Sequence, residues 1–326
     1  RREEAASPAS HTWATLALVS SDAAGVRVDR QAPALPAVVD TAETYQFLAN
    51  GQMKVLRRGF VGRRRPLQRL VRVLRDGKFA DVDGDTLHEV AGVVVWGMKG
   101  VGKSCLVARA VERARQHGPG LGMVVLHGAL DDMAVLAAFQ QLAVDHWGDA
   151  EAEKLLANKD LPVLQRVRRV LALWRTRSVA LILDDFEQNL EIRSDGPARL
   201  HSYAAELLDV LLPACKLGKP KLLITTTATF EAPAAHAAAL GELRLGTLEP
   251  ASVRKLWVRG PSASAHIPVS LAHWEKLAVR LGNNARILSW ARDLLASKTS
   301  DEMEKIAARA AEQVPVWEPG DEARQE

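Results

Sequence analysis

The chain has 326 residues, of which 48% are hydrophobic and 25% are charged. This composition is ordinary for a globular protein, and the length suggests one large domain plus a smaller one that need neither metal ions nor disulfides for a core. The net charge of +4 is spread over many expected helices. Such a spread is typical of solvated helix faces and disfavours nucleic acid as the main partner.

The cysteines and the N-terminus bear on where the protein works. Cys105 and Cys215 have no metal-type spacing, and a reducing cytoplasm is the simplest interpretation. No run approaches the roughly 20 apolar residues that span a bilayer, so no membrane partner is expected. The chain starts with Arg1-Arg2 rather than an initiator methionine, and we expect it to be part of a longer polypeptide.

Residues 1–56 are expected to be the tail of an upstream domain plus a linker. They are rich in Ala, Pro, Ser and Asp, with an apolar run at 13–20 that suggests a strand and a linker at 31–36. Beyond them, helical periodicity at 67–74 ends near Gly77, and the acidic stretch at 78–89 is expected to be a polar hairpin or loop.

Strands and helices then alternate within an expected core at 57–248. Helical patterns lie between apolar strands expected at 93–96, 122–127, 179–183, 222–225 and 242–245. Short apolar strands joined by helical crossovers predict an α/β fold, with a parallel β-sheet flanked by helices on both faces.

After Pro250 the pattern is helical only, and a small all-helical lid subdomain is expected at 249–313. Its helices are expected at 250–258, 270–281, 285–297 and 300–312. The tail at 314–326 is expected to be disordered or truncated.

The strongest motif follows the strand at 93–96 and begins a helix. It fits G-x-x-x-x-G-K-[ST], the phosphate-binding P-loop, in which glycines let backbone N–H groups point at phosphates. We expect Lys103 to neutralise the β- and γ-phosphates during catalysis and Ser104 to ligate Mg²⁺; the alternative is a plain glycine turn. The expected nucleotide-binding residues of this loop are Gly97, Lys99, Gly100, Val101, Gly102, Lys103, Ser104 and Cys105.

An acidic group follows the apolar strand at 179–183. Asp184 is expected to reach Mg²⁺, mostly through water, as the Walker B aspartate. Asp185 is expected to orient the attacking water, with Glu187 as a second candidate for that catalytic role. The alternative is an exposed acidic loop.

Three threonines end the strand at 222–225. Thr226 and Thr227 are the expected candidates for a sensor of the γ-phosphate at the tip of this strand. The alternative is that these β-branched residues are there because they suit a strand.

With these motifs the chain resembles, over roughly 57–312, the STAND-class P-loop ATPases, an AAA-like family of regulatory switches that includes NB-ARC and NACHT domains. The segment Phe60-Val61-Gly62-Arg63-Arg64-Arg65, with Leu67 in the following helix, is similar to the F-V-G-R-x-x-x-L signature of that family. The resemblance implies that Val61, Gly62 and Arg63 lie on the base side of the nucleotide. It also places Ala285, within 281–288, at the position of the proline in the lid's G-x-P segment.

The resemblance implies a switch that binds ATP or ADP with Mg²⁺, hydrolyses ATP slowly, and forms a homo-oligomer in its ATP state. Effector and sensor domains would lie outside this chain, in a multidomain signalling or defence protein. Two departures matter, because threonines and Ala228 replace the arginine of the family's sensor strand, and Ala285 replaces the lid proline. They weaken the expectation of efficient hydrolysis and of a tight ADP-bound state.

The segment at 13–22, followed by a Pro-rich linker, resembles the tail of a caspase-like CHAT domain joined to such an ATPase in bacterial proteins.

Two other function classes stay open. One is a DNA-associated ATPase of the initiator or transcription-regulator type, which needs a DNA-reading domain after the lid. The other is a nucleotide-binding scaffold without turnover. The arginines at 57–65 could contact nucleic acid, but they overlap the segment expected to pack against the bound nucleotide, which is the favoured interpretation. His127, His146, His201 and His273 have no metal-type spacing and are expected to be surface or packing residues.

Overall fold

The computed structural model describes residues 45–48, 53–56, 60–80, 86–118, 120–193, 196–259 and 271–296. The strand expected at 13–20, the linker at 31–36, the helix at 300–312 and the basic residues Arg57 and Arg58 lie outside these residues.

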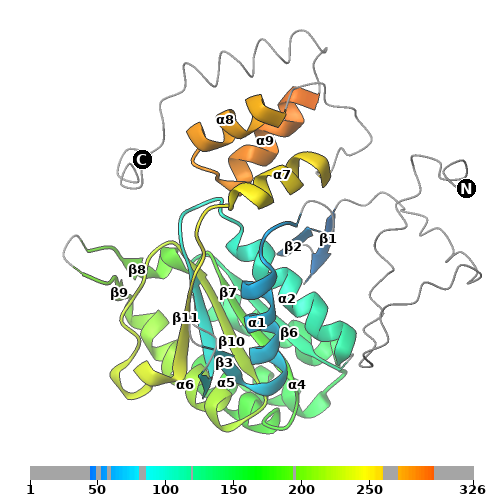
Figure 1. The fold of residues 1–326 in the computed structure, drawn as a ribbon. Helices are drawn as coiled ribbons and strands as arrows, with labels where there is room; N and C mark the ends of the chain where they lie inside the picture. The colour runs from blue at the N-terminus through cyan, green and yellow to red at the C-terminus, as the bar shows by residue number, and fades with distance from the viewer. Residues whose placement is uncertain are drawn as a thin grey trace, which may run out of the picture. The chain divides into compact units, whose positions relative to one another are not determined.

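The centre of the fold is a five-stranded, fully parallel β-sheet (Figure 1). Its strands are β5 (Gly92–Trp96), β6 (Gly122–His127), β7 (Val179–Asp184), β10 (Lys221–Thr226) and β11 (Leu240–Arg244). They lie in the order β11-β5-β10-β7-β6. The predicted α/β fold with a parallel sheet is therefore confirmed, and each predicted strand is present to within two residues.

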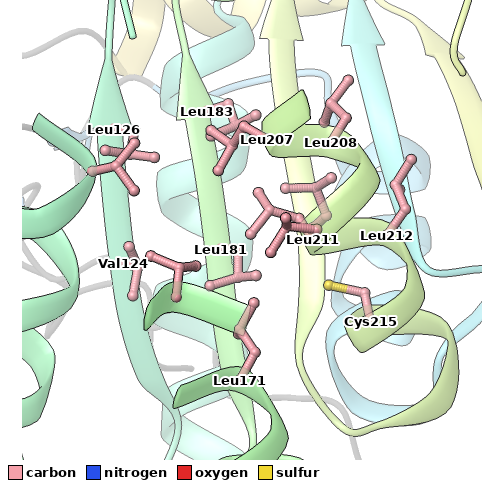
Figure 2. Close-up of a cluster of buried hydrophobic side chains, with 14 of the residues drawn as sticks. Val124, Leu126, Leu171, Leu181, Leu183, Leu207, Leu208, Leu211, Leu212 and Cys215 are labelled. Carbon is pink, nitrogen blue, oxygen red and sulfur yellow. The ribbon is translucent and has the colours of Figure 1, made fainter. Parts of the chain in front are cut away.

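Both faces of the sheet are buried, which explains why the strands are apolar without a break. In β7, Leu181 and Leu183 belong to one hydrophobic cluster, and the alternate residues Ala180 and Ile182 belong to the other. Figure 2 shows the first face, where leucines of one helix lie over leucines of β7. A strand that is covered on two sides needs apolar side chains at every position.

Helices cover the two faces unequally. Residues of α1 and α2 fill the cluster on one face, and residues of α3 to α6 fill the cluster on the other. The helices of this core are α1 (Arg64–Asp76), α2 (Lys103–His117), α3 (Asp132–Gln140), the π-helix η2 (Gln141–His146), α4 (Ala150–Ala157), α5 (Val163–Leu173), the 3₁₀ helix η3 (Phe186–Asn189), α6 (Ser202–Leu217) and the 3₁₀ helix η4 (Ala234–Ala239).

Three short antiparallel hairpins accompany the sheet. They are β1 (Tyr45–Leu48) with β2 (Met53–Leu56), β3 (Lys78–Ala80) with β4 (Leu87–Glu89), and β8 (Leu190–Glu191) with β9 (Arg199–Leu200). The second is the polar hairpin expected at 78–89. The first was not expected, since the sequence there is read as a linker; it buries Met53 in the same cluster as α1 and α2.

Among the residues that the structure describes, three further helices follow the sheet and have a hydrophobic cluster of their own. They are α7 (Pro250–Arg259), α8 (Leu271–Arg280) and α9 (Ala285–Ala296). Trp274 of α8 is fully buried at the centre of the cluster and stacks on Trp257 of α7. These helices lie within two residues of the expected positions.

Because all five strands are parallel, their carboxyl ends meet at one edge of the sheet. The P-loop follows β5 there, the acidic group begins at the last residue of β7, and the threonines lie at the end of β10. Open α/β sheets bind ligands at this edge, and β10 lies between β5 and β7. The sheet order alone therefore brings the three predicted motifs together.

Candidate functional site

The loop between β5 and α2 has the backbone conformation of a phosphate cradle. Gly97, Gly100 and Gly102 have backbone φ values of 147°, 83° and 99°, which residues other than glycine rarely adopt. A Cβ on Gly100 would also lie 2.7 Å from Oδ1 of Asn284. Glycine is therefore required here both for the turn and for the close approach of the segment before α9.

Lys103 is the first residue of α2, and its side chain curls back over the loop. Its Nζ donates hydrogen bonds to the carbonyl oxygens of Gly97, at 2.7 Å, and of Met98, at 3.0 Å. Burial lowers the pKa of this lysine, and the nearby charges of Glu187, Asp185 and Asp184 act against that lowering. The three acids expected at the site therefore act on the ammonium group expected to hold the phosphates.

Ser104 and Cys105 follow in the first turn of α2, and both are partly exposed. The Lys99 side chain is exposed, while its backbone carbonyl accepts a hydrogen bond from Asn284. Val101 is buried in the core beneath the loop.

Asp184 is the last residue of β7 and is only 4% exposed. Its Oδ1 accepts a 2.5 Å hydrogen bond from the hydroxyl of Thr225 on the neighbouring strand β10. Its Oδ2 lies on the side of His127. One oxygen is thus held by Thr225, and the other faces the imidazole of His127.

Asp185 has a left-handed backbone, with φ 53° and ψ 45°. Its N–H donates to the Thr225 hydroxyl at 3.1 Å, and its side chain is 43% exposed. A non-glycine residue in this conformation costs energy, and such strain collects at functional sites. The turn carries the Asp185 side chain out of the sheet while Asp184 stays buried.

Glu187 follows in η3. Its Oε2 is buried without a hydrogen-bond partner among the described residues. A buried carboxylate oxygen in that state is costly. Its charge also acts on Lys103 more strongly than that of either aspartate. Glu187 therefore suits a role in which it accepts a proton or a hydrogen bond from a ligand.

The threonines at the end of β10 have separate partners. Thr225, which is not one of the two expected sensors, binds both Asp184 and the Asp185 backbone. The Thr226 hydroxyl is fully buried and donates to the carbonyl oxygen of Ala228 at 3.1 Å, and Thr227 is partly exposed. The threonine that contacts the acidic group is thus the first of the three.

His127 ends β6 and lies directly beside Asp184 on β7. Its Nδ1 is 3.3 Å from Oδ2 of Asp184, and its Nε2 is 3.4 Å from Oδ2 of Asp185. The ring is at the surface, as expected, but it also faces both carboxylates, which the sequence did not predict. The missing information is the pairing of β6 with β7.

The segment before α1 joins three parts of the structure. Arg63 donates to the carbonyl oxygens of Val101 in the P-loop and of Gly246 after β11. Burial lowers the pKa of its guanidinium, and the charge of Glu249 opposes that effect. Gly62 approaches Ser252 of α7 so closely that a Cβ would lie 2.1 Å from its Oγ, and Val61 packs on the α7–α9 cluster.

The start of α9 contacts the P-loop directly. Nδ2 of Asn284 donates to the Lys99 carbonyl at 2.9 Å, and the Arg286 N–H donates to the Gly100 carbonyl at 3.0 Å. Oδ1 of Asn284 accepts from the Arg286 N–H at 3.1 Å, so this side chain also caps the helix. Ala285, between them, packs on the helical cluster. Asn284 and Arg286 were not among the predicted residues, although asparagine is a preferred helix cap.

The donors at this edge suit a hard divalent ion. Asp184 and Ser104 offer a carboxylate oxygen and a hydroxyl, and Mg²⁺ prefers oxygen ligands while keeping several waters. The hydrogen bond from Thr225 to Oδ1 restrains the rotation of the Asp184 carboxylate, and this restraint also fixes the direction of Oδ2. The residues therefore fit Mg²⁺ bound together with a nucleotide.

No family model and no curated protein matches this chain. Among solved structures, it is similar to domain III of the replication initiation protein DnaA from Thermotoga maritima, with 13% identity, a TM-score of 0.48 and coverage of 78% of this chain and 95% of that one. RuvB from the same organism matches with 16% identity, a TM-score of 0.46 and coverage of 78% and 70%.

A third similar structure is a signal transduction ATPase with numerous domains (STAND) from Pyrococcus horikoshii, which has a tetratricopeptide repeat sensor. The identity is 19%, the TM-score is 0.42, and the match covers 78% of this chain but only 32% of that one. At such low similarity these structures indicate at most a fold, and any function has to be inferred from the residues of this chain.

The fold and the motif agree on a coarse assignment. A parallel sheet flanked by helices, with G-x-x-x-x-G-K-[ST] between the inner strand β5 and a helix, is the P-loop NTPase fold and forms a nucleotide-binding module. Within the described part of the chain, no helix has both the length and the apolar character required to span a bilayer.

Proposed function

We propose that this chain is a regulatory switch that binds ATP or ADP with Mg²⁺ and couples the phosphate loop to the position of α7–α9. The observation that carries the proposal is the contact between the start of α9 and the loop. Asn284 and Arg286 donate hydrogen bonds to the carbonyl oxygens of Lys99 and Gly100. The N–H groups of the same loop are the ones expected to bind the phosphates. A change in the conformation of the loop would therefore alter the hydrogen bonds that hold the start of α9.

Each residue has a role in the proposal. Lys103 exchanges its bonds to loop carbonyls for bonds to phosphate oxygens. Ser104 and Asp184 would hold Mg²⁺, which would neutralise charge on the phosphates. Asp185, Glu187 or both orient and deprotonate the attacking water, and Arg286 supplies a cation on the first turn of α9. Val61, Gly62 and Arg63 lie toward the base.

The proposed organisation is a nucleotide-binding core at 57–248, which the β1–β2 hairpin joins through Met53, and a lid at 249–313. Effector and sensor domains would lie outside this chain and would respond to assembly in the ATP state. We place this protein among cytoplasmic bacterial signalling or defence proteins, with slow hydrolysis resetting the switch. A linked CHAT domain is one candidate effector.

The test of nucleotide binding is thermal unfolding with ADP-Mg²⁺ or ATP-Mg²⁺. At about 100 times its Kd, a ligand adds about 2.7 kcal/mol to the unfolding free energy, which amounts to a rise of several degrees in Tm. The rise is expected in the parent and in Lys154→Ala, whose lysine is exposed on α4, and not in Lys103→Ala. A rise that persists in Lys103→Ala would contradict this binding mode.

Hydrolysis separates the switch from a scaffold. Asp185→Asn keeps a side chain that tolerates the left-handed backbone but cannot act as a base. We expect it to bind ADP as the parent does and to hydrolyse ATP at least about a hundredfold more slowly, the lower end of the range for loss of a general base. A parent and a variant that are equally inactive would support a non-hydrolysing scaffold.

The DNA-associated alternative is compatible with the same fold. Duplex DNA that raises ATP turnover, or binds with the steep salt dependence of phosphate contacts, would favour it over the switch.

A further inference from the structure

A histidine and two aspartates converge at the carboxyl edge of β6 and β7. One ligand atom from each of His127, Asp184 and Asp185 lies within 4.8 Å of the other two. The imidazole faces both carboxylates, at 3.3 Å and 3.4 Å. We refer to these three residues as the His–Asp cluster.

The ligand atoms of the His–Asp cluster are close enough together to reach one ion. A divalent ion with bonds of about 2.1 Å has neighbouring ligand atoms about 3 Å apart and opposite ones about 4.2 Å apart. In the structure, Nδ1 of His127 faces Asp184 at 3.3 Å and Nε2 faces Asp185 at 3.4 Å, so one of these nitrogen–oxygen pairs has the spacing of neighbouring ligands. Because one ion binds a single ring nitrogen, the other carboxylate has to turn toward that nitrogen, and the exposed side chains of His127 and Asp185 leave room for such a rotation.

The chemistry of the cluster differs from that of an all-oxygen site. Imidazole suits first-row transition ions, whereas Mg²⁺ and Ca²⁺ prefer oxygen ligands. Asp184 is held by Thr225 through its other oxygen, so the oxygen that faces His127 is prearranged. A ligand that is already oriented loses little freedom when it binds an ion.

We propose that the His–Asp cluster binds a divalent transition-metal ion through a ring nitrogen of His127 and the carboxylates of Asp184 and Asp185. The inference rests on the proposed function because Asp184 is also the aspartate assigned to the nucleotide's metal ion. In the nucleotide-free protein, the cluster would bind Mn²⁺, and other ions that accept nitrogen ligands, in preference to Mg²⁺.

The competing explanation is an ion pair, in which a protonated His127 bridges the two carboxylates without any metal. The side chains of His127 and Asp185 are 48% and 43% exposed, so such a pair would be weak. The two explanations differ in whether the ring nitrogen coordinates an added ion.

The test is Mn²⁺ binding to the nucleotide-free protein, followed by electron paramagnetic resonance. The parent and His146→Ala, which removes an exposed histidine of η2, are expected to bind Mn²⁺ and to show coupling between Mn²⁺ and a ¹⁴N nucleus. In His127→Ala the coupling disappears and the affinity for Mn²⁺ falls by roughly tenfold or more, while that for Mg²⁺ changes little. A parent without ¹⁴N coupling, or equal Mn²⁺ affinities, overturns the proposal.

A second variant and a second ligand keep the interpretation unambiguous. His127→Gln retains a polar side chain of similar reach without an imidazole, and it is expected to lose the coupling at an unchanged Tm. ADP binding measured in a metal chelator tests the P-loop independently. If ADP fails to bind but the coupling is present, the cluster stands and the proposed nucleotide switch falls; the reverse result overturns the cluster alone.

Discussion

At the scale of single residues, Thr225 connects the two aspartates of the site. Its hydroxyl donates to Oδ1 of Asp184 and accepts from the Asp185 N–H. Thr225→Val keeps the shape but leaves a buried carboxylate oxygen without its donor. We expect a loss of about 1 to 3 kcal/mol in unfolding free energy and weaker Mg²⁺-dependent nucleotide binding. Denaturant unfolding and ADP titration with and without Mg²⁺ measure the two effects.

Thr226→Val is the matched control, because Thr226 is equally buried and its hydroxyl is bonded only within its own turn. It should leave the Mg²⁺ dependence unchanged. The opposite pattern, with Thr226→Val affecting nucleotide binding and Thr225→Val neutral, would restore Thr226 as the sensor. The sequence could place three threonines at a strand end, but which hydroxyl faces Asp184 depends on the register of β10 against β7.

At the scale of elements, two helices of the core differ in what their capping aspartate does. Asp131 caps α3 by accepting from the Ala134 N–H. Asp149 caps α4 and also accepts from the Trp174 indole, at 3.1 Å, and pairs with Arg177, at 2.8 Å. We expect Asp131→Ala to cost about 1 kcal/mol and Asp149→Ala about 2 to 3 kcal/mol in unfolding free energy. Equal losses would show that the indole and the arginine contribute nothing.

The contribution of Asp149 should depend on pH. Burial raises the pKa of its carboxyl, but the Ala152 N–H, the Trp174 indole and Arg177 outweigh burial and leave the pKa below its ordinary value. A lowered carboxyl pKa stabilises the fold above the unfolded-state value of about 4, and the effect is lost as the pH falls through the folded-state value. The difference between parent and Asp149→Ala should therefore shrink in acid, as urea unfolding at a series of pH values would show.

Elements with a clear hydrophobic pattern could be predicted from the sequence, and those defined by their neighbours could not. The strands β5, β6, β7 and β10 are apolar runs because helices cover both faces, so the burial itself is visible in the sequence. The β1–β2 hairpin has no such run, and the burial of Met53 shows that it joins the core.

At the scale of the whole molecule, Asn284 connects the helices α7–α9 to the phosphate loop. Asn284→Ala removes the cap of α9 and the bond to the Lys99 carbonyl. We expect ADP to bind roughly fivefold more weakly, since a lost contact of about 1 kcal/mol leaves the loop less well ordered. The Arg286 amide should also exchange with solvent faster.

Calorimetric titration and hydrogen exchange measure these effects, and Ser289→Ala, one turn further along α9, is the control. Unchanged ADP affinity in Asn284→Ala would separate the helices from the nucleotide and contradict the switch. The sequence does not predict the roles of Asn284 and Arg286, because these roles depend on the contact between the start of α9 and the P-loop.

Arg63 gives the molecule a mechanical property. The chain enters α7 through the residues after β11, and the guanidinium of Arg63 binds the Gly246 carbonyl there and the Val101 carbonyl in the P-loop. The same side chain thus ties the connection that leads into α7 to the phosphate loop. A force applied on the C-terminal side of the chain is expected to reach the loop through these two hydrogen bonds whenever it displaces Gly246.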